Sequence, residues 1–281
     1  MLKFIQNEPA LLIKVNNEKI LLISDLHLGF EKELYSHGFN IPSQIDRIYN
    51  KLGNLLNIYK PSRLIILGDV KHGTSKILPH EWSDIPNFFE RLLTNVDKID
   101  IIPGNHDGSL KTLLPSKVNL HTTKGLMLKS GKRLIYLIHG HSWPSPEAFT
   151  ADILIMGHHH FVVEIMDTSG LRLIEPIWFV AKWDKEKIIS SFLKSRRLKV
   201  GKNPINSFKK IFKFTPKNPR IIIMPTFNPL LRGMAVNKNT NKDYLGPIFE
   251  SGAIDIENSE LYLLDGTYLG YLSNIKHLSF E

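Results

Sequence analysis

The sequence has 281 residues, of which 42% are hydrophobic and 22% charged, so the chain can bury a sizeable core and has the composition of an ordinary globular protein. It contains no cysteine, which excludes disulfides and thiolate metal sites, so a bound metal would need His, Asp, Asn or Glu ligands. There is no apolar run of membrane-spanning length and no signal-peptide pattern at the N-terminus, so we expect a cytoplasmic protein.

The N-terminal half alternates predicted strands and helices. Residues 11–15 and 19–23 predict a hairpin, and apolar residues at helical spacing predict a helix from Ile45 to Leu56. A strand at 64–67, a helix at 84–93 and a strand at 99–102 follow. This order of strand, helix and strand is typical of a layered α/β fold.

The later part of the chain is richer in predicted strands, at 135–138, 153–156, 161–166 and 221–224 and in a hairpin over 260–272. Between them, apolar residues at helical spacing alternate with Lys and Arg. We therefore expect three parts: a core over residues 1–181, a basic helical insertion over 182–219, and C-terminal strands over 220–281 that complete the core.

Five of the apolar strands run directly into polar residues that could bind metal. Their ends read Ser24-Asp25-Leu26-His27, Gly68-Asp69, Gly104-Asn105-His106-Asp107, His139-Gly140-His141 and Gly157-His158-His159-His160. A mixed set of nitrogen and oxygen ligands suits Mn, Fe or Zn better than an all-oxygen Ca or Mg site. Seven ligands suit two ions that share one carboxylate, and such a pair can hold a bridging hydroxide that attacks a phosphate ester in line.

Taken in order, these motifs resemble those of the calcineurin-like metallophosphoesterases over roughly residues 20 to 161. Within that superfamily, the stretch from Ser24 to Glu31 is similar to the archaeal SbcD-related phosphoesterases and the bacterial ligase-associated DNA-damage endonucleases. The resemblance implies a four-layer α/β/β/α sandwich with two divalent ions, Mn in preference to Zn or Fe, at the strand ends.

The resemblance also implies a role for each motif residue. Asp69 would bridge the two ions, His106 would protonate the leaving oxygen, and Asp107 would orient His106. The first ion would be held by Asp25, His27 and His160, and the second by Asn105, His139 and His158. Many family members place another Asn, Asp or His in the residues after the bridging residue, whereas here Val70-Lys71-His72 follows Asp69. Two interpretations of His72 stay open: it fills this role outside the ligand shell, or it does not. His141 and His159 flank predicted ligands. Two interpretations are open for each: it contacts a ligand or the substrate, or it is simply exposed to solvent.

Positive charge is concentrated in one segment. From Lys182 to Arg220 there are thirteen Lys or Arg and two acidic residues, a net charge of +11, whereas the whole chain carries +9. Such a concentration favours binding to nucleic acid or, second, to an anionic membrane surface, but it is also compatible with a solvated face. The nucleic-acid interpretation rests on Lys194, Arg196, Arg197, Lys209 and Lys210, with the interleaved Trp183, Phe208, Phe212 and Phe214 either stacking on bases or lying in the core.

The sequence thus favours a two-metal phosphodiesterase or nuclease acting on DNA or RNA, in repair or processing. Two alternatives stay open: a phosphatase or phosphodiesterase for a small nucleotide, and a non-catalytic interaction scaffold. The resemblance implies repair partners such as a helicase or ligase, although no residue indicates one, and the oligomeric state has no signal in the sequence.

Overall fold

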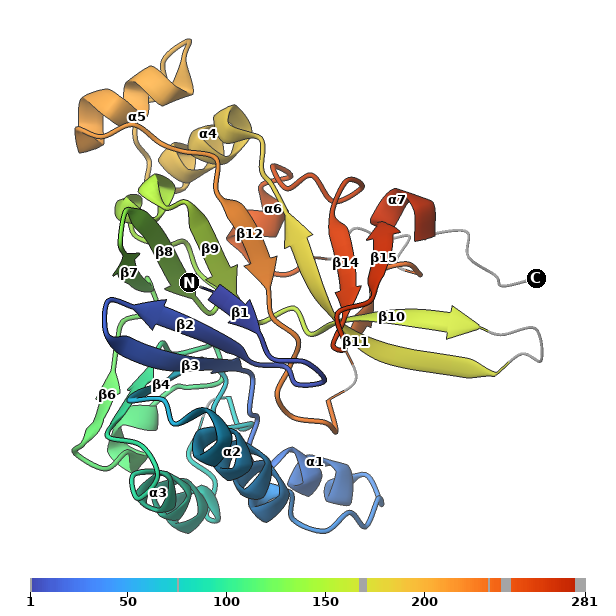
Figure 1. Cartoon of the computed structure of the whole chain (residues 1–281). Coiled ribbons are helices and arrows are strands. Elements are labelled where there is room, and N and C mark those ends of the chain that lie inside the picture. The colour runs from blue at the N-terminus through green and yellow to red at the C-terminus, as the bar shows by residue number, and fades with distance from the viewer. Residues whose placement is uncertain (1, 75, 167–170, 232, 239–243, 276–281) are drawn as a thin grey trace.

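The computed structural model describes residues 2–74, 76–166, 171–231, 233–238 and 244–275, which form two β-sheets flanked by helices (Figure 1). Sheet one has the order β1-β2-β3-β4-β5-β6, with strands β1 (Leu2–Phe4), β2 (Leu11–Val15), β3 (Glu18–Ser24), β4 (Arg63–Leu67), β5 (Lys98–Ile101) and β6 (Val118–Leu120).

Sheet two has the order β13-β10-β11-β12-β9-β8-β7, and β14 joins it by pairing with both β11 and β15. Its strands are β7 (Leu126–Ser130), β8 (Arg133–Ile138), β9 (Ile153–Met156), β10 (Phe161–Met166), β11 (Arg172–Ala181), β12 (Arg220–Ile223), β13 (Met234–Ala235), β14 (Glu260–Leu263) and β15 (Tyr268–Tyr271).

The helices are α1 (Phe30–Ser36), α2 (Ile45–Tyr59), α3 (Glu81–Leu92), α4 (Lys185–Ser195), α5 (Pro204–Phe212), α6 (Pro247–Glu250) and α7 (Leu272–Ile275), with short 3₁₀ turns at Leu110–Leu113 and Pro146–Thr150. In the part of the chain that the structure describes, no helix is both long enough and apolar enough to cross a membrane.

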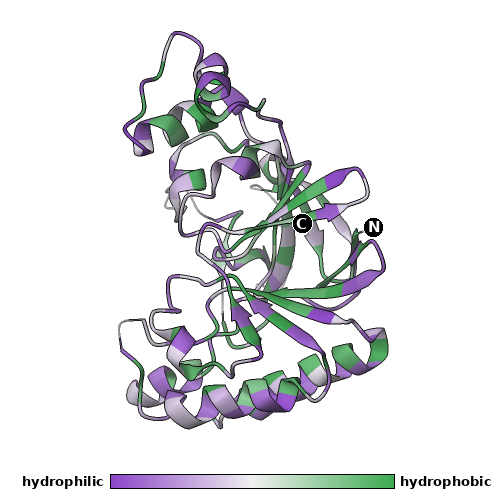
Figure 2. Ribbon diagram, turned by 90° about the vertical axis from the view of Figure 1, so that its left-hand side faces the viewer, coloured by the Kyte–Doolittle hydropathy of each residue, from purple (hydrophilic) through white to green (hydrophobic). Residues whose placement is uncertain are grey.

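Strand periodicity explains the layers. In β4, Leu64 and Ile66 pack with α2 and α3 on the outer face of sheet one, whereas Ile65 and Leu67 point between the sheets. The residues that fill the space between the sheets include Leu22, Ile65, Leu137, Ile155 and Ile222. Figure 2 shows the same division, with largely hydrophobic strands and helices that combine hydrophobic and hydrophilic residues.

The outer face of sheet two is covered by α4 and α5. Their buried residues Phe192 and Phe208 pack with Phe149 against the face that carries Phe179 and Ile223. Four layers result, in the order helix, sheet, sheet and helix, and the predicted α/β/β/α sandwich is confirmed. The division of the chain into a core, an insertion and completing strands stays a prediction.

Candidate metal centre

Five strand ends deliver the predicted site residues to one edge of the sandwich. β3, β4 and β5 are parallel neighbours in sheet one, and β8 and β9 are parallel neighbours in sheet two. Residues that follow the carboxyl ends of parallel strands lie at the same edge of a sheet. The structure brings together all the predicted His and Asp ligands, namely Asp25, His27, Asp69, His139, His158 and His160.

These six residues form two groups, each with its candidate ligand atoms within 4.8 Å of one another. One group is Asp25, His27 and His160, and the other is Asp69, His139 and His158. The Oδ2 atom of Asp69 lies 3.3 Å from His27 Nε2 and 3.4 Å from His139 Nε2, so this oxygen faces both groups. The arrangement matches the division implied for two ions with a shared carboxylate. That these residues bind metal stays a prediction.

The backbone is strained at five of these six residues. Asp25, His27 and Asp69 have φ angles of 57°, 41° and 48°, and His158 and His160 have φ angles of 75° and 46°. Residues other than glycine rarely adopt this left-handed region, and such conformations cluster at functional sites where the surrounding structure enforces them. Strand ends that turn this abruptly direct side chains into a common space.

Two glycines allow the strand ends to approach each other. A Cβ atom on Gly68 would lie 2.5 Å from His139 Nδ1 and 2.6 Å from the backbone nitrogen of Gly104. A Cβ atom on Gly104 would collide with the Asp69 carboxylate. Any side chain at either position would therefore displace a predicted ligand.

The donor atoms of the cluster fit a divalent transition metal. His139 Nδ1 donates to the carbonyl oxygen of Leu67 at 2.8 Å, which leaves Nε2 as the lone-pair nitrogen aimed at Asp69. The Nε2 atoms of His27, His139 and His160 are buried and have no hydrogen-bond partner among the described residues. Unpartnered imidazole nitrogens beside buried carboxylates are the ligands that Mn, Fe and Zn accept.

Charge in the cluster also favours cation binding. Burial alone would raise the pKa of Asp25, but His160 and His139 hold it at about 2. Burial likewise opposes ionisation of Asp69, yet His139 and His27 lower its pKa. Burial would lower the pKa of His139, but Asp69 and Asp25 raise it to about 9, so a metal ion that binds Nε2 must displace a proton from this ring. Burial and the neighbouring His139 lower the pKa of His158 to about 3, so this ring is neutral and can ligate.

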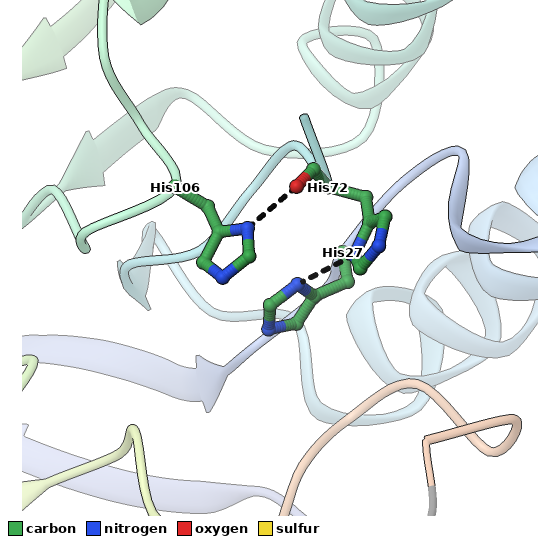
Figure 3. Close-up of side chains that lie close together, drawn as sticks. All are labelled: His27, His72 and His106. Carbon is green, nitrogen blue, oxygen red and sulfur yellow. Dashed lines mark hydrogen bonds between the residues drawn. The ribbon is translucent and has the colours of Figure 1, made fainter. Parts of the chain in front are cut away.

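His106 and His72 lie beside the first group (Figure 3). The His106 ring is 4.7 Å from the His27 ring, centroid to centroid, and its Nδ1 donates to the carbonyl oxygen of His72 at 2.5 Å. That bond leaves Nε2 of His106 free to serve as the predicted proton donor.

His72 connects His27 to α1, and Glu33, which the sequence analysis missed, completes the connection. Nδ1 of His72 lies 3.2 Å from Nδ1 of His27, and its Nε2 contacts the carboxylate of Glu33. If Nε2 of His72 donates to Glu33, its Nδ1 accepts from His27, and His27 keeps Nε2 as the lone-pair nitrogen. No sequence pattern indicates Glu33, because α1 is short and has no apolar stripe.

Asp107, which was predicted to orient His106, is bonded to backbone N–H groups and acts on His106 through the loop that carries it, so its role stays a prediction. One carboxylate oxygen of Asp107 accepts from the backbone N–H of Val70 at 2.8 Å, and the other accepts from Gly104 at 2.8 Å. The His106 ring is oriented instead by the His72 carbonyl. Asp107 is buried and ties the loop after β5 to the loop after β4, and burial together with the charge of Asp69 raises its pKa to about 6.

The remaining motif residues differ in exposure. Asn105, the seventh predicted ligand, is exposed, next to His106. The His141 ring lies 5.3 Å from that of His139, centroid to centroid, and burial lowers its pKa to about 4. His159 is buried, packs on Phe249 and contacts the carbonyl oxygen of Leu245 at 2.8 Å, which excludes simple solvent exposure for this residue.

The basic segment, residues 182–219, lies at the other end of sheet two. Lys217 contacts Asp152, which precedes β9, whereas His158 follows β9. Figure 1 places α4 and α5 at that far end. The five predicted nucleic-acid contacts are all exposed there: Lys194, Arg196, Arg197, Lys209 and Lys210.

The interleaved aromatic residues belong to the core, so the alternative that they stack on bases is wrong for the buried ones. Trp183 and Phe208 are buried in the cluster on the outer face of sheet two. Phe212 and Phe214 are half-buried and pack on Phe208 at centroid distances of 4.7 and 5.4 Å. The apolar side of the helices faces sheet two, and only the cations are offered to a partner.

The region that matches a known family contains the candidate metal centre. The sequence model of the calcineurin-like phosphoesterases matches residues 18–183, which is more than half of the chain and contains every residue of the two groups. The chain belongs to the calcineurin-like phosphoesterase family. This phosphoesterase is accordingly a hydrolase, and the family binds divalent metals.

Solved structures similar to this phosphoesterase include a nuclease, MPE, from Pseudomonas putida, with 18% identity, a TM-score of 0.49, and coverage of 94% of this chain and 98% of that one. The phosphoesterase Yfce from E. coli has 22% identity and a TM-score of 0.33, over 54% of this chain and 75% of that one. An archaeal phosphodiesterase has 16% identity and a TM-score of 0.31, over 55% and 81%. No curated protein matches the sequence. The substrate has to be argued from the site.

Proposed function

We propose that this phosphoesterase uses two divalent ions, Mn in preference to Zn or Fe, to hydrolyse phosphodiester bonds in DNA or RNA. The observation that carries the proposal is the Asp69 carboxylate, whose Oδ2 faces His27 of one group and His139 of the other at nearly equal distances. A pair of ions in such a site supplies an activated water nucleophile and neutralises charge on the phosphoryl group.

The chain's own residues would provide the remaining chemistry. His106 stands beside the first group with Nδ1 bound to the His72 carbonyl, so its Nε2 can give a proton to the leaving oxygen. Asp107 holds the backbone of Gly104 and Val70, and so positions the loop that carries His106. The exposed position of Asn105 at the rim leaves it available to substrate or to the second ion.

The basic segment supports a polyanionic substrate over a small nucleotide. Its cations are exposed, and its net charge contrasts with the rest of the chain. A role in repair, with a helicase or ligase as partner, is carried only by the family resemblance of the Ser24 to Glu31 stretch.

The experiment is hydrolysis by metal-stripped protein that is reconstituted separately with Mn, Zn, Fe and Mg. Single-stranded and duplex DNA, RNA and a small chromogenic phosphodiester are the substrates, and Asp69→Asn is the control. We expect Mn-restored cutting of polynucleotide that Asp69→Asn loses and that rising salt weakens. Cleavage of the small ester alone would favour the nucleotide enzyme, and metal binding without any hydrolysis would favour the scaffold.

A further inference from the structure

Residues 24–27, which we call the metal-ligand loop, contain the predicted ligands Asp25 and His27. Three consecutive residues of the loop that follows β12 bind this metal-ligand loop. Phe227 donates its backbone N–H to the carbonyl oxygen of Ser24 at 2.9 Å. Thr226 donates its hydroxyl to the carbonyl oxygen of Asp25 at 2.9 Å. Asn228 donates its side-chain amide to the carbonyl oxygen of Leu26 at 2.8 Å. Three successive backbone carbonyls of the ligand loop thus have partners on one other segment.

The side chains of Thr226 and Asn228 use both their donor and their acceptor groups in or beside this contact. Asn228 is 1% exposed, and its Oδ1 accepts from the backbone N–H of Leu230 at 3.0 Å. Its amide also lies 3.4 Å from the carbonyl oxygen of His27. Thr226 is 8% exposed, and its hydroxyl accepts from the backbone N–H of Asn228 at 3.3 Å. A side chain needs both a donor and an acceptor to replace Asn228 here.

The held residues are the ones whose backbone is strained. Asp25 and His27 have φ angles of 57° and 41°, which persist only where neighbouring groups fix them. The backbone N–H groups of Asp25 and His27 donate to the carbonyl oxygens of Gly68 and Asp69 at 3.2 and 2.7 Å, so the loop after β4 and the loop after β12 hold these residues from two sides. In Figure 1 the orange chain after β12 descends to the connection between β3 and α1, so the contact joins sheet two to sheet one.

We propose that Thr226 and Asn228 are positioning residues that hold Asp25 and His27 in the conformation in which these two residues bind the first metal ion. Both residues lie outside residues 18–183, the region that matches the family. The C-terminal part of the chain would therefore contribute to the metal centre without supplying a ligand. Because this role presupposes metal binding by Asp25, His27 and His160, it rests on the function proposed above.

The test is calorimetric titration of metal-stripped full-length protein with Mn²⁺, comparing Asn228→Ala with the matched variant Asn237→Ala. Asn237 is also buried, and its amide makes a similar pair of bonds, to the N–H and C=O of Glu164 at 3.0 and 2.8 Å, away from the metal centre. Loss of an outer-shell partner typically weakens metal binding by about 10–100-fold. We expect a loss of at least about tenfold at one of two Mn²⁺ sites in Asn228→Ala and less than about twofold in Asn237→Ala.

A second pair of variants keeps the test decisive if Asn228→Ala does not fold. Thr226→Ser retains the hydroxyl and should retain Mn²⁺ affinity, whereas Thr226→Val removes it at similar volume and should lose affinity. Unchanged affinity in both Asn228→Ala and Thr226→Val, or an equal loss in Asn237→Ala, would overturn the positioning role. Mn²⁺ binding without hydrolysis in the unchanged protein would overturn only the proposed function, whereas no Mn²⁺ binding at all would overturn both.

Discussion

The metal centre and the basic segment lie at opposite ends of sheet two, and they differ in how their residues come together. The centre collects side chains from the ends of five strands that are far apart in the sequence. The basic segment is continuous, and its α4 and α5 contact each other and the face beneath them. Residues of matched chemistry at several strand ends specify a site, whereas one amphipathic stretch specifies only which side of a helix is buried.

Under the proposed function, the metal centre carries out the chemistry and the basic segment captures the substrate. Asp152 precedes β9 and Gly157 follows it, and at about 3.3 Å per strand residue these two positions are about 16 Å apart. A ligand that touches both regions must therefore span at least about 16 Å, as a polynucleotide does. A small diester would reach only the centre.

The largest expected effect is a loss of hydrolysis after a substitution beside the metal centre. His106→Ala should retain Mn²⁺ binding, because the two groups that contain a carboxylate do not include His106, which is grouped only with His27 and His72. The variant should lose the proposed proton donor. Loss of a general acid typically costs about 10²–10⁴-fold, so kcat should fall about 10³-fold on the small diester and on polynucleotide alike. The exposed His37→Ala serves as the matched control and should keep the rate. An unchanged rate in His106→Ala would rule out the acid role.

The next effect tests whether the aromatic residues of the basic segment belong to the fold. Phe208 is fully buried against Phe149, Phe192 and Phe212, so Phe208→Ala should create a cavity. We expect the free energy of unfolding to fall by about 3 kcal/mol in denaturant titration. Ile211→Ala, on the exposed side of α5, should cost much less. Full stability of Phe208→Ala with weakened polynucleotide binding would instead restore the stacking interpretation.

Much of the fold could be predicted, because its strands and main helices carry strong local patterns. The apolar runs of β3, β4, β8 and β9 and the helical spacing in α2 are examples. α1 has a single buried residue, Glu31, and β13 has only two residues, so neither could produce a detectable pattern. Local periodicity is visible in a sequence only where burial repeats.

The candidate site likewise has residues that the sequence could indicate and residues that it could not. Asp25, Asp69 and His158 could be identified as candidates because each follows an apolar strand. Asn228 could not, because its partners are backbone carbonyls about 200 residues earlier, and a backbone carbonyl has no sequence signature. The partners of Asp107 could not be predicted for a related reason, since the N–H groups that it accepts from are placed by the loop geometry after β4 and β5.

A smaller effect should distinguish capture from chemistry. Replacing Lys194, Lys209 and Lys210 with Gln removes three exposed charges without touching the core. If they contact phosphates, the slope of log affinity against log salt should fall by up to about 3, and polynucleotide binding should weaken by about tenfold at moderate salt. Hydrolysis of the small diester should not change. The matched variant Lys3→Gln, Lys14→Gln, Lys129→Gln removes the same charge elsewhere, and an equal loss there would show that only net charge matters.

The smallest expected effect is on stability, and it concerns the ion pair between Lys217 of the basic segment and Asp152. Lys217 Nζ donates to Asp152 at 2.7 Å, and this bond, with the N–H of Leu134, lowers the pKa of Asp152. A carboxyl whose pKa is lower in the folded state stabilises the fold above its unfolded pKa of about 4, and this contribution disappears as the pH falls through the folded value.

Asp152→Asn should therefore lower the free energy of unfolding at pH 7 by less than about 1 kcal/mol, because the pair is partly exposed, and the difference from the unchanged protein should disappear as the pH falls through the lowered pKa of Asp152. Denaturant titrations at several pH values measure it. A difference that persists undiminished at low pH would show that the ion pair does not cause it and that Lys217 does not fasten the basic segment to β9. If the pair does fasten it, Asp152→Asn should also leave hydrolysis of the small diester unchanged, because the metal ligands lie at the other end of the strand.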